Sequence, residues 1–385
     1  MLGGRVGALA AGLFVYGFGQ ELWFRFLPAY LRSLGASALL VGAFGTLKDL
    51  LDAAYAWPGG VLTDRLGSRR ALLLFGGLTL CGFVAYLASP TVPVLFAGLL
   101  LVMAWPALGL PATFSLVGEE LSRERRIAGF TLQAVLKRVP IVLAPPLGGF
   151  LIGRFGMHAG MRTGFAASVV LALAMLAALR VAFRPRGEVP PPPSRGAVAL
   201  PTALRRLLAA DVLIRLCEGL PDVFIVVWVL EEVGLSPARF GLLTSLLTAT
   251  AIVSYVPAVA LSGRAEKKSF IVLTYVFFTA FPLAVLLGRS FPALAVAFVV
   301  GGLREIGEPA RKAYIVDAAP EEARGRVVGL YYAFRGFSVA GAAAIGGVLW
   351  SVRPELTFLV AACLGVLGTL GAAIFLPRAA AQDRC

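Results

Sequence analysis

Charged side chains inside otherwise apolar stretches are the residues of this sequence best suited to chemistry. Glu21 and Arg25 lie four positions apart in one such stretch, and therefore on one face of a helix. A second stretch carries Asp211, Arg215, Glu218 and Asp222 at i, i+4, i+7 and i+11, which is one helical stripe. The others are Lys48, Asp49, Asp52, Lys137, Arg138, Arg304, Glu305, Glu308, Arg311, Lys312 and Arg335. Nine are basic and eight are acidic, so mutual pairing would nearly neutralise them.

Two kinds of chemistry suit buried groups of these types. A carboxylate in an apolar environment can take up and release a proton, and a guanidinium group binds carboxylate or phosphate through two parallel hydrogen bonds. We assign proton coupling to Glu21, Glu218, Asp222 and Glu308. We assign binding of an anionic or zwitterionic substrate to Arg25, Arg138, Arg304 and Arg335. For any one residue, the alternative role is half of a static ion pair that fixes helix register.

Membrane-spanning helices are the elements that must hold these groups. Of the 385 residues, 59% are hydrophobic and only 15% are charged, whereas a soluble domain carries about 25% charged residues. With about 20 apolar residues needed per span, the sequence predicts twelve spans and no cleaved signal peptide. They are 7–30, 39–62, 71–88, 92–116, 127–151, 163–183, 207–231, 238–262, 269–288, 292–316, 327–350 and 356–377. Asp211, Arg311 and Lys312 fall within about two turns of span ends, where we expect them to snorkel or form gates.

Basic residues outside the spans lie mostly on one side of the predicted membrane. Nineteen fall on the side of the two termini and six on the opposite side. By the positive-inside rule, both termini are cytoplasmic in a multi-pass protein of the plasma (inner) membrane. The net charge of +14 therefore reflects topology, so we expect the lipid bilayer as a partner and no nucleic acid.

Four consecutive prolines, at 190–193, interrupt the chain between the sixth and seventh spans. Because a proline run forms a semi-rigid linker, we predict an N-terminal six-helix bundle over 1–183, a cytoplasmic linker over 184–206 and a C-terminal six-helix bundle over 207–385. An offset of 199 places Gly35, Gly42 and Arg65 on Gly234, Gly241 and Arg264, and one of 198 places Gly148-Gly149 on Gly346-Gly347. The shared register predicts two pseudo-symmetric all-α bundles around a central site.

One motif lies between the second and third predicted spans. It reads Gly60-Val61-Leu62-Thr63-Asp64-Arg65-Leu66-Gly67-Ser68-Arg69 and resembles motif A, G-x-L-x-D-R-x-G-x-R, of the major facilitator superfamily. The resemblance extends over nearly the whole chain and implies a twelve-helix transporter that works by alternating access. Gly60 permits close helix approach, Gly67 a tight turn, and Asp64 can accept charged hydrogen bonds. With Arg65 and Arg69 these residues would form a conformational latch, unless the arginines only fix topology.

Two further family motifs are matched in part or not at all. The segment Ala144-Pro145-Pro146-Leu147-Gly148-Gly149 resembles the end of motif C, which the family associates with antiporters, although Ala144 replaces a glycine. The alternative is that these residues only bend a helix and admit a neighbour. The fourth span has Trp105-Pro106 where motif B carries an arginine, so that arginine's proton-relay role is not transferred.

The sequence as a whole favours a secondary active transporter. The single histidine, His158, lies in a predicted outer loop, and no G-x-x-x-x-G-K-[ST] segment is present. We therefore expect no enzymatic activity, no metal, no cofactor and no ATP-driven pumping.

The expected protein is a monomer that moves a small organic solute by alternating access, coupled to protons, with a lean toward export by antiport. The alternative within transport is a uniporter or importer of an anionic metabolite whose buried ion pairs are gates. The alternative outside transport is a membrane receptor, which would have little reason to keep this many intramembrane charges.

Overall fold

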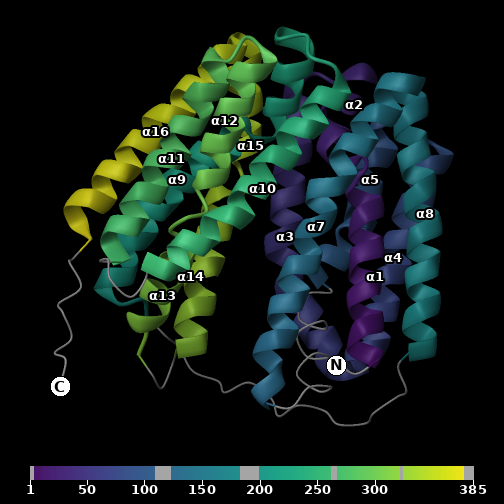
Figure 1. The fold of residues 1–385 in the computed structure, drawn as a ribbon, viewed down its shortest axis with the longest axis horizontal. Coiled ribbons are helices and arrows are strands. Elements are labelled where there is room, and N and C mark those ends of the chain that lie inside the picture. The colour runs from purple at the N-terminus through teal and green to yellow at the C-terminus, as the bar shows by residue number, and fades with distance from the viewer. Residues whose placement is uncertain (1–3, 109–122, 183–198, 262–266, 321–323, 377–385) are drawn as a thin grey trace. The chain divides into compact units, whose positions relative to one another are not determined.

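Helices joined by short turns make up the computed structural model (Figure 1), which describes residues 4–108, 123–182, 199–261, 267–320 and 324–376. Six helical stretches of this described part are long and apolar enough to cross a membrane. They are Arg69–Ala88, Met157–Val181, Pro237–Tyr255, Lys268–Leu287, Val327–Val352 and Pro354–Phe375. Val327–Val352 is itself divided between two helices, Arg324–Val339 and Ala342–Val352, and the other spans are interrupted or carry charges. The predicted all-α architecture with twelve spans is confirmed.

The helices pack as two compact units. Unit 1 consists of Met1–Ala36, Leu47–Pro193 and Ser236–Ser245, and unit 2 of Ser37–Thr46, Ser194–Leu235 and Leu246–Cys385. Each unit therefore includes a short segment from the other half of the sequence. Unit 1 holds α1 (Gly4–Glu21), η1 (Phe24–Phe26), α2 (Leu27–Ser33), most of α3 (Ala38–Leu66), α4 (Ser68–Ala88), α5 (Val92–Val102), η2 (Ala104–Leu108), α7 (Arg123–Phe155) and α8 (Met157–Ala182). Unit 2 holds α9 (Thr202–Val227), η3 (Trp228–Glu232), most of α10 (Pro237–Leu261), α11 (Lys267–Leu287), α12 (Phe291–Leu303), α13 (Glu308–Asp317), α14 (Arg324–Val339), α15 (Ala342–Val352) and α16 (Pro354–Phe375).

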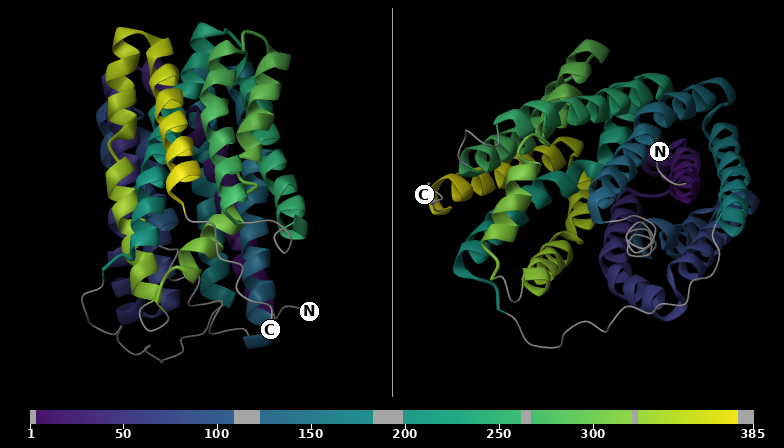
Figure 2. Two further views of the ribbon diagram at one scale, coloured as in Figure 1. Left: turned by 90° about the vertical axis from the view of Figure 1, so that its left-hand side faces the viewer. Right: turned by 60° about the horizontal axis from the view of Figure 1, so that its bottom comes forward.

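The two units repeat one packing scheme. In unit 1, α1 packs on α7 and α8, and α4 packs on α5 and α8. In unit 2, α9 packs on α15 and α16, and α11 packs on α12 and α16. Figure 2 shows these helices running side by side within each unit. Gly35 and Gly234, paired by the sequence repeat, both have positive φ, at 87° and 73°, just before α3 and α10. The predicted pseudo-symmetry is confirmed at the level of packing.

Glycines paired by the repeat make equivalent close contacts. A Cβ at Gly148 would fall on the carbonyl of Leu22 in unit 1, and a Cβ at Gly346 would fall on the carbonyl of Leu220 in unit 2. The next glycine of each pair also contacts a backbone carbonyl: Gly149 lies against that of Pro237 in unit 1, and Gly347 against that of Ala38 in unit 2. The motif C glycines and their repeat partners are thus places where helix backbones touch and no larger residue fits.

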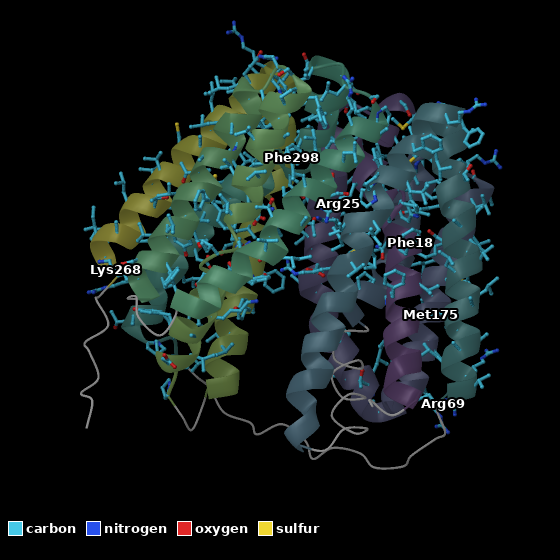
Figure 3. All side chains as sticks on the ribbon, viewed as in Figure 1. Phe18, Arg25, Arg69, Met175, Lys268 and Phe298 are labelled. Atoms are coloured by element: carbon cyan, nitrogen blue, oxygen red, sulfur yellow. The ribbon has the colours of Figure 1, made fainter. Side chains whose placement is uncertain are left out.

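Two basic side chains cap the C-terminal ends of equivalent helices, α8 and α16. Arg69 Nη2 donates to the carbonyl of Arg180 near the end of α8, at 2.7 Å, and Lys268 Nζ donates to the carbonyl of Leu376 after α16, also at 2.7 Å (Figure 3). The last carbonyls of a helix have no partner within it and carry partial negative charge, so a cation there is favourable. The offset of 199 relates Arg69 to Lys268, which extends the repeat to helix capping.

Several spans that we predicted as continuous helices are interrupted within the described residues. The first breaks between Glu21 and Leu27, the tenth at 304–307, and the eleventh between Val339 and Ala342. Pro28 and Pro309 lie in the first turns of α2 and α13, where the missing N–H costs nothing, and Gly341 precedes α15. The continuous ranges 7–30, 292–316 and 327–350 were therefore wrong at these points.

A candidate proton and anion site in unit 2

Seven charged side chains from four parts of unit 2 form one connected group, here called the charge cluster. Its members come from α9, from the break after α12, from α13 and from α14. They are Asp211, Arg215, Glu218, Arg304, Glu308, Arg311 and Arg335. In the tenth span, Arg304, Glu308 and Arg311 form ion pairs with the charged stripe of α9. The two charged stretches seen in the sequence therefore pair with each other.

The driest end of the charge cluster is the pair Asp211–Arg311. Arg311 Nη1 lies 2.7 Å from Asp211 Oδ2, and the side chains are only 2% and 1% exposed. The hydroxyl of Tyr331 donates to Asp211 Oδ2 at 2.9 Å, and that of Tyr275 donates to Oδ1 at 3.2 Å. Of the two roles expected for Asp211 and Arg311, snorkelling to the surface was therefore wrong, because tyrosines from α11 and α14 close over the carboxylate and replace water as its donors. The other role, as a gate, stays a prediction.

The middle of the charge cluster is Glu308, which two arginines hold at once. Arg311 forms a fork on it, with Nη2 at 2.8 Å from Oε2 and Nε at 3.0 Å from Oε1. Arg215 Nη2 adds a third hydrogen bond to Oε1 at 2.9 Å. Two-point arginine pairs of this kind are strong and geometrically specific. Glu308 therefore accepts three arginine hydrogen bonds among the described contacts.

The accessible end of the charge cluster is Glu218 with its two arginines. Arg215 Nη1 donates to Glu218 Oε2 at 2.6 Å, whereas Arg304 Nη1 lies 3.3 Å from Oε1. Side-chain exposure here is 24% for Glu218 and 16% for Arg304, compared with 1% for Asp211. The guanidinium groups of Arg215 and Arg304 both lie over the Phe278 ring, 5.1 and 5.2 Å from its centroid. The ring therefore contacts the faces of the two cations, while carboxylates bind their N–H groups.

Positive charge is in surplus in the charge cluster, since four arginines face three carboxylates. Arg335 is the additional cation: its Nη1 lies 3.6 Å from Asp211 Oδ2, too far for a hydrogen bond to an oxygen that already accepts from Arg311 and Tyr331. That nitrogen is buried and has no hydrogen-bond partner in the described part of the chain. The guanidinium rests on the Tyr332 ring, 4.7 Å from its centroid, and the side chain is 20% exposed. Among the described residues, Arg335 is therefore the member of the charge cluster whose guanidinium is held by a carboxylate at the longest distance.

The break in the tenth span places its charges at favourable helix ends. Arg304 caps the C-terminus of α12 and Glu308 opens α13, which matches the sign of each helix dipole. The hydroxyl of Thr274 accepts the Gly307 N–H at 2.7 Å and fixes the unwound turn. In unit 1, Thr79 likewise accepts the Trp105 N–H at 2.9 Å where α5 gives way to the π turn η2. Sequence reasoning missed both threonines and the role of Tyr275, because nothing distinguishes such residues from ordinary buried polar ones.

The other predicted site residues lie elsewhere. Glu21 and Arg25 form a pair in unit 1, with Oε2 and Nε 3.2 Å apart (Figure 3). Arg138 is half-buried on α7, and Asp222 is exposed on α9, one turn beyond Glu218. The side chains of Asp64 and Lys137 and the environment of Gly60 lie outside what the structure describes. Gly67 has φ at 77° and precedes α4, as the tight turn required.

Comparison with known proteins places this geometry in a family. The model of the Major Facilitator Superfamily matches residues 9–217 and again 207–384. The chain belongs to the Major Facilitator Superfamily. An uncharacterized MFS-type transporter of Methanocaldococcus jannaschii is 22% identical over 93% of this chain and 91% of its own. The enterobactin exporter EntS of Salmonella typhimurium is 26% identical over 84% of this chain and 80% of its own.

Solved structures agree on the fold of this Major Facilitator Superfamily member. A POT family transporter in complex with 5-aminolevulinic acid superposes with a TM-score of 0.77 at 14% identity, covering 96% of this chain and 95% of that one. A bacterial homologue of the iron transporter ferroportin in an inward-facing state gives 0.75 at 15% identity, over 98% and 100%. With the family match, the chain is a multi-pass membrane transport protein, as the motif A resemblance implied, and not an enzyme.

Proposed function

We propose that this transporter moves a small organic anion by alternating access and that the movement is coupled to protons. The observation that carries the proposal is that four arginines meet three carboxylates among the described contacts of the charge cluster, which lies on segments predicted to span the membrane. A cation whose hydrogen-bond donors are not all satisfied is costly away from water. A transported anion would relieve that cost whenever it binds.

The proposed setting follows the topology of the sequence. The chain would lie in the plasma (inner) membrane as a monomer, with both termini in the cytoplasm. Gly60, Asp64, Arg65, Gly67 and Arg69 of motif A would act as the conformational latch. Export is the favoured direction, because relatives at 25–26% identity are named enterobactin exporters and motif C is partly matched.

The test combines a binding screen with a flux measurement. Small organic anions, enterobactin among them, are compared with their neutral amides and with amines for the rise they give in the melting temperature of the purified protein. Anions that stabilise the protein are then followed in proteoliposomes with and without an imposed pH gradient. We expect anions to stabilise the protein more than their amides, and a pH gradient to drive them above equilibrium. Equal flux with and without the gradient would contradict proton coupling.

A second proposal, uniport with the ion pairs as gates, is favoured by one observation. The Asp211–Arg311 pair is almost completely buried and has four hydrogen-bond or charge partners, as a static structural pair would. Under this proposal no carboxylate of the charge cluster changes its protonation state. The gradient experiment above separates the two, because a uniporter equilibrates its solute whatever the proton gradient.

A further inference from the structure

One end of unit 1, where α7 turns into α8, carries positive charge without negative charge; it is here called the basic end. Three described segments meet there, 27–36, 150–163 and 236–241, because the Tyr30 ring contacts the His158 ring and Gly149 lies against the Pro237 carbonyl. The positive-inside rule accounts for arginines at the opposite end of the helices and leaves this group unexplained. The three segments contain no acidic residue, and their basic and imidazole side chains are Arg32, Arg154, His158, Arg162 and Arg239.

Two arginines of the basic end have donors to offer. Arg154 and Arg162 are exposed, and neither forms an ion pair or a side-chain hydrogen bond in the described part of the chain. The guanidinium of Arg154 lies over the neighbouring Phe155 ring, 5.9 Å from its centroid. A ring in that position contacts one face of the guanidinium and leaves its N–H groups for an oxygen ligand.

Arg154 ends a stripe of exposed apolar side chains on α7. Leu143, Leu147, Phe150 and Arg154 stand at i, i+4, i+7 and i+11, and all four are exposed. In a membrane transport protein, such an apolar stripe suits contact with lipid tails. An arginine at its end suits the level of the lipid headgroups.

Arg162 ends a second stripe, on α8. Val170 and Leu173 follow it at i+8 and i+11, and both are exposed. His158, one turn before Arg162, is exposed in the first turn of α8, which contains no acidic residue. The dipole of a helix favours an anion at its first turn and disfavours a cation there. A phosphate group at this place would therefore be favoured by the helix and by both side chains.

A buried hydroxyl beside these cations lacks a partner. Tyr30 on α2 is fully buried, its ring centroid lies 5.6 Å from that of His158, and its hydroxyl has no hydrogen-bond partner within the described residues. Arg162 acts electrostatically on the same hydroxyl. Buried polar groups are normally hydrogen-bonded, so an orphan hydroxyl next to unpaired cations points to an acceptor from outside the chain.

We propose that the basic end of unit 1 binds the headgroup of an anionic phospholipid, with Arg154 and Arg162 on its phosphate and its acyl chains along the apolar stripes of α7 and α8. Guanidinium groups bind phosphate through two parallel hydrogen bonds. A phospholipid with net negative charge fits better than phosphatidylcholine, whose ammonium group would add another cation to a place that has no carboxylate. The site shares no residue with the charge cluster and does not depend on the proposed function.

Unit 2 supplies a matched control at the equivalent turn, between α15 and α16. The offset of 199 places Arg154 on Arg353 and Arg162 on Ala361, which is buried. Glu355 lies two residues after Arg353 and is exposed. This turn therefore has one arginine and one carboxylate where the basic end has two arginines, and we expect no preference for an anionic lipid there.

Native mass spectrometry of the full chain in a neutral detergent can count the lipids that the protein retains. The protein is titrated with phosphatidylglycerol or with phosphatidylcholine. The double variant Arg154→Gln with Arg162→Gln should retain one phosphatidylglycerol fewer than the unmodified protein and as much phosphatidylcholine. Arg162→Gln alone should weaken that binding step about fivefold, the usual contribution of one arginine near an anionic lipid surface. Arg162→Lys, which keeps the charge, and Arg353→Gln should both retain the lipid.

Hydrogen exchange in nanodiscs locates the lipid on the chain. Amides of the α7–α8 turn and of the first turn of α8 should exchange more slowly in phosphatidylglycerol than in phosphatidylcholine. The double variant should lose this difference. The turn between α15 and α16 is the internal reference and should exchange alike in both lipids.

Three results would overturn the proposal. The first is equal retention of phosphatidylglycerol by the double variant and the unmodified protein. The second is an equal loss of retained lipid in Arg353→Gln, which would mean that any arginine at these turns serves. The third is protection of the α7–α8 turn by soluble glycerol phosphate in phosphatidylcholine nanodiscs to the same extent as by phosphatidylglycerol, which would assign the turn to a free anion. No transported solute is present in these measurements, so failure of the proposed function would not change their outcome.

Discussion

At the scale of residues, the charge cluster runs from a dry end to an accessible one. Asp211 accepts hydrogen bonds from Arg311, Tyr331 and Tyr275 and is fully buried. Glu218, two turns along α9, has one short and one long arginine contact and is a quarter exposed. Two carboxylates on one helical face therefore have different surroundings, which burial and partners decide and spacing does not.

Removing Arg311 should destabilise the protein far more than removing Arg25. Arg311→Ala leaves Asp211 and Glu308 buried without their main cation, and breaking a buried pair from one side costs about 3–5 kcal/mol. Arg25→Ala removes a contact of which the arginine side is 40% exposed, where a pair contributes about 0–1 kcal/mol. Thermal unfolding in detergent measures both. Similar melting temperatures for the two variants would show that the Asp211–Arg311 pair does not hold α13 in place.

The sequence allowed the charged residues to be predicted, but not their partners. Ionisable groups in apolar stretches are visible by composition alone, and four of the eight predicted site residues, Glu218, Glu308, Arg304 and Arg335, fall in the charge cluster. Arg215 and Glu308 are 93 positions apart, and no spacing rule reports such a distance. Tyr275 could not be predicted, since tyrosine in a span is most often an interface or packing residue.

At the scale of elements, glycines decide where helix backbones can meet. Gly148 on α7 touches the Leu22 carbonyl at the break of the first span, and Gly346 on α15 touches the Leu220 carbonyl on α9. These contacts give the partial motif C a structural role in this chain. The same role recurs in the second half, where no motif marks it.

Gly148→Ala should be destabilising, and Gly153→Ala on the same helix should not. The added Cβ at 148 would overlap the Leu22 carbonyl, whereas at 153 it meets nothing within 4 Å. Overpacking costs about 1–3 kcal/mol, while glycine to alanine in an open helical position is neutral or gains up to about 1 kcal/mol. Melting temperatures of the two variants should therefore move in opposite directions or differ by several degrees. Equal values would mean that α7 can shift away from Leu22 at no cost.

Thr274→Val tests the anchor of the broken tenth span. Valine keeps the shape but leaves the Gly307 N–H without its acceptor, and an orphaned buried donor costs about 1–3 kcal/mol. Faster hydrogen exchange at Gly307 and a lower melting temperature are expected. Thr163→Val is the control, since Thr163 donates only to Ala159 of its own helix and is exposed. Unchanged exchange at Gly307 in Thr274→Val would show that the turn is held by other contacts.

The number of spans was easier to predict than their breaks. Apolar length identifies a span whether or not its helix is continuous, so hydropathy cannot separate α12 from α13. Pro28 and Pro309 were the available signals, yet proline is common in continuous spanning helices such as α7, which contains Pro140, Pro145 and Pro146. The breaks depend on partners such as Thr274, which only the folded chain supplies.

At the scale of the whole molecule, the two units share one helix packing but have different residues at equivalent positions. The offset of 199 places Arg304 of the charge cluster on Trp105, which packs at 5.1 Å from the Tyr16 ring in unit 1. Helix order, glycine contacts and basic caps repeat, whereas in the sequence no member of the charge cluster falls on a charged residue at this offset. Under the proposed function, the repeated scaffold would supply the movement and unit 2 would supply the coupling.

The central claim is that unit 2 couples solute movement to protons through Glu218. The most direct test is to measure Glu218→Gln in proteoliposomes, with counterflow exchange and gradient-driven accumulation of the same solute side by side. We predict that exchange persists and that accumulation in response to a pH gradient is lost. Accumulation equal to that of the unmodified protein would contradict the account, because the carboxylate of Glu218 would then have no part in coupling.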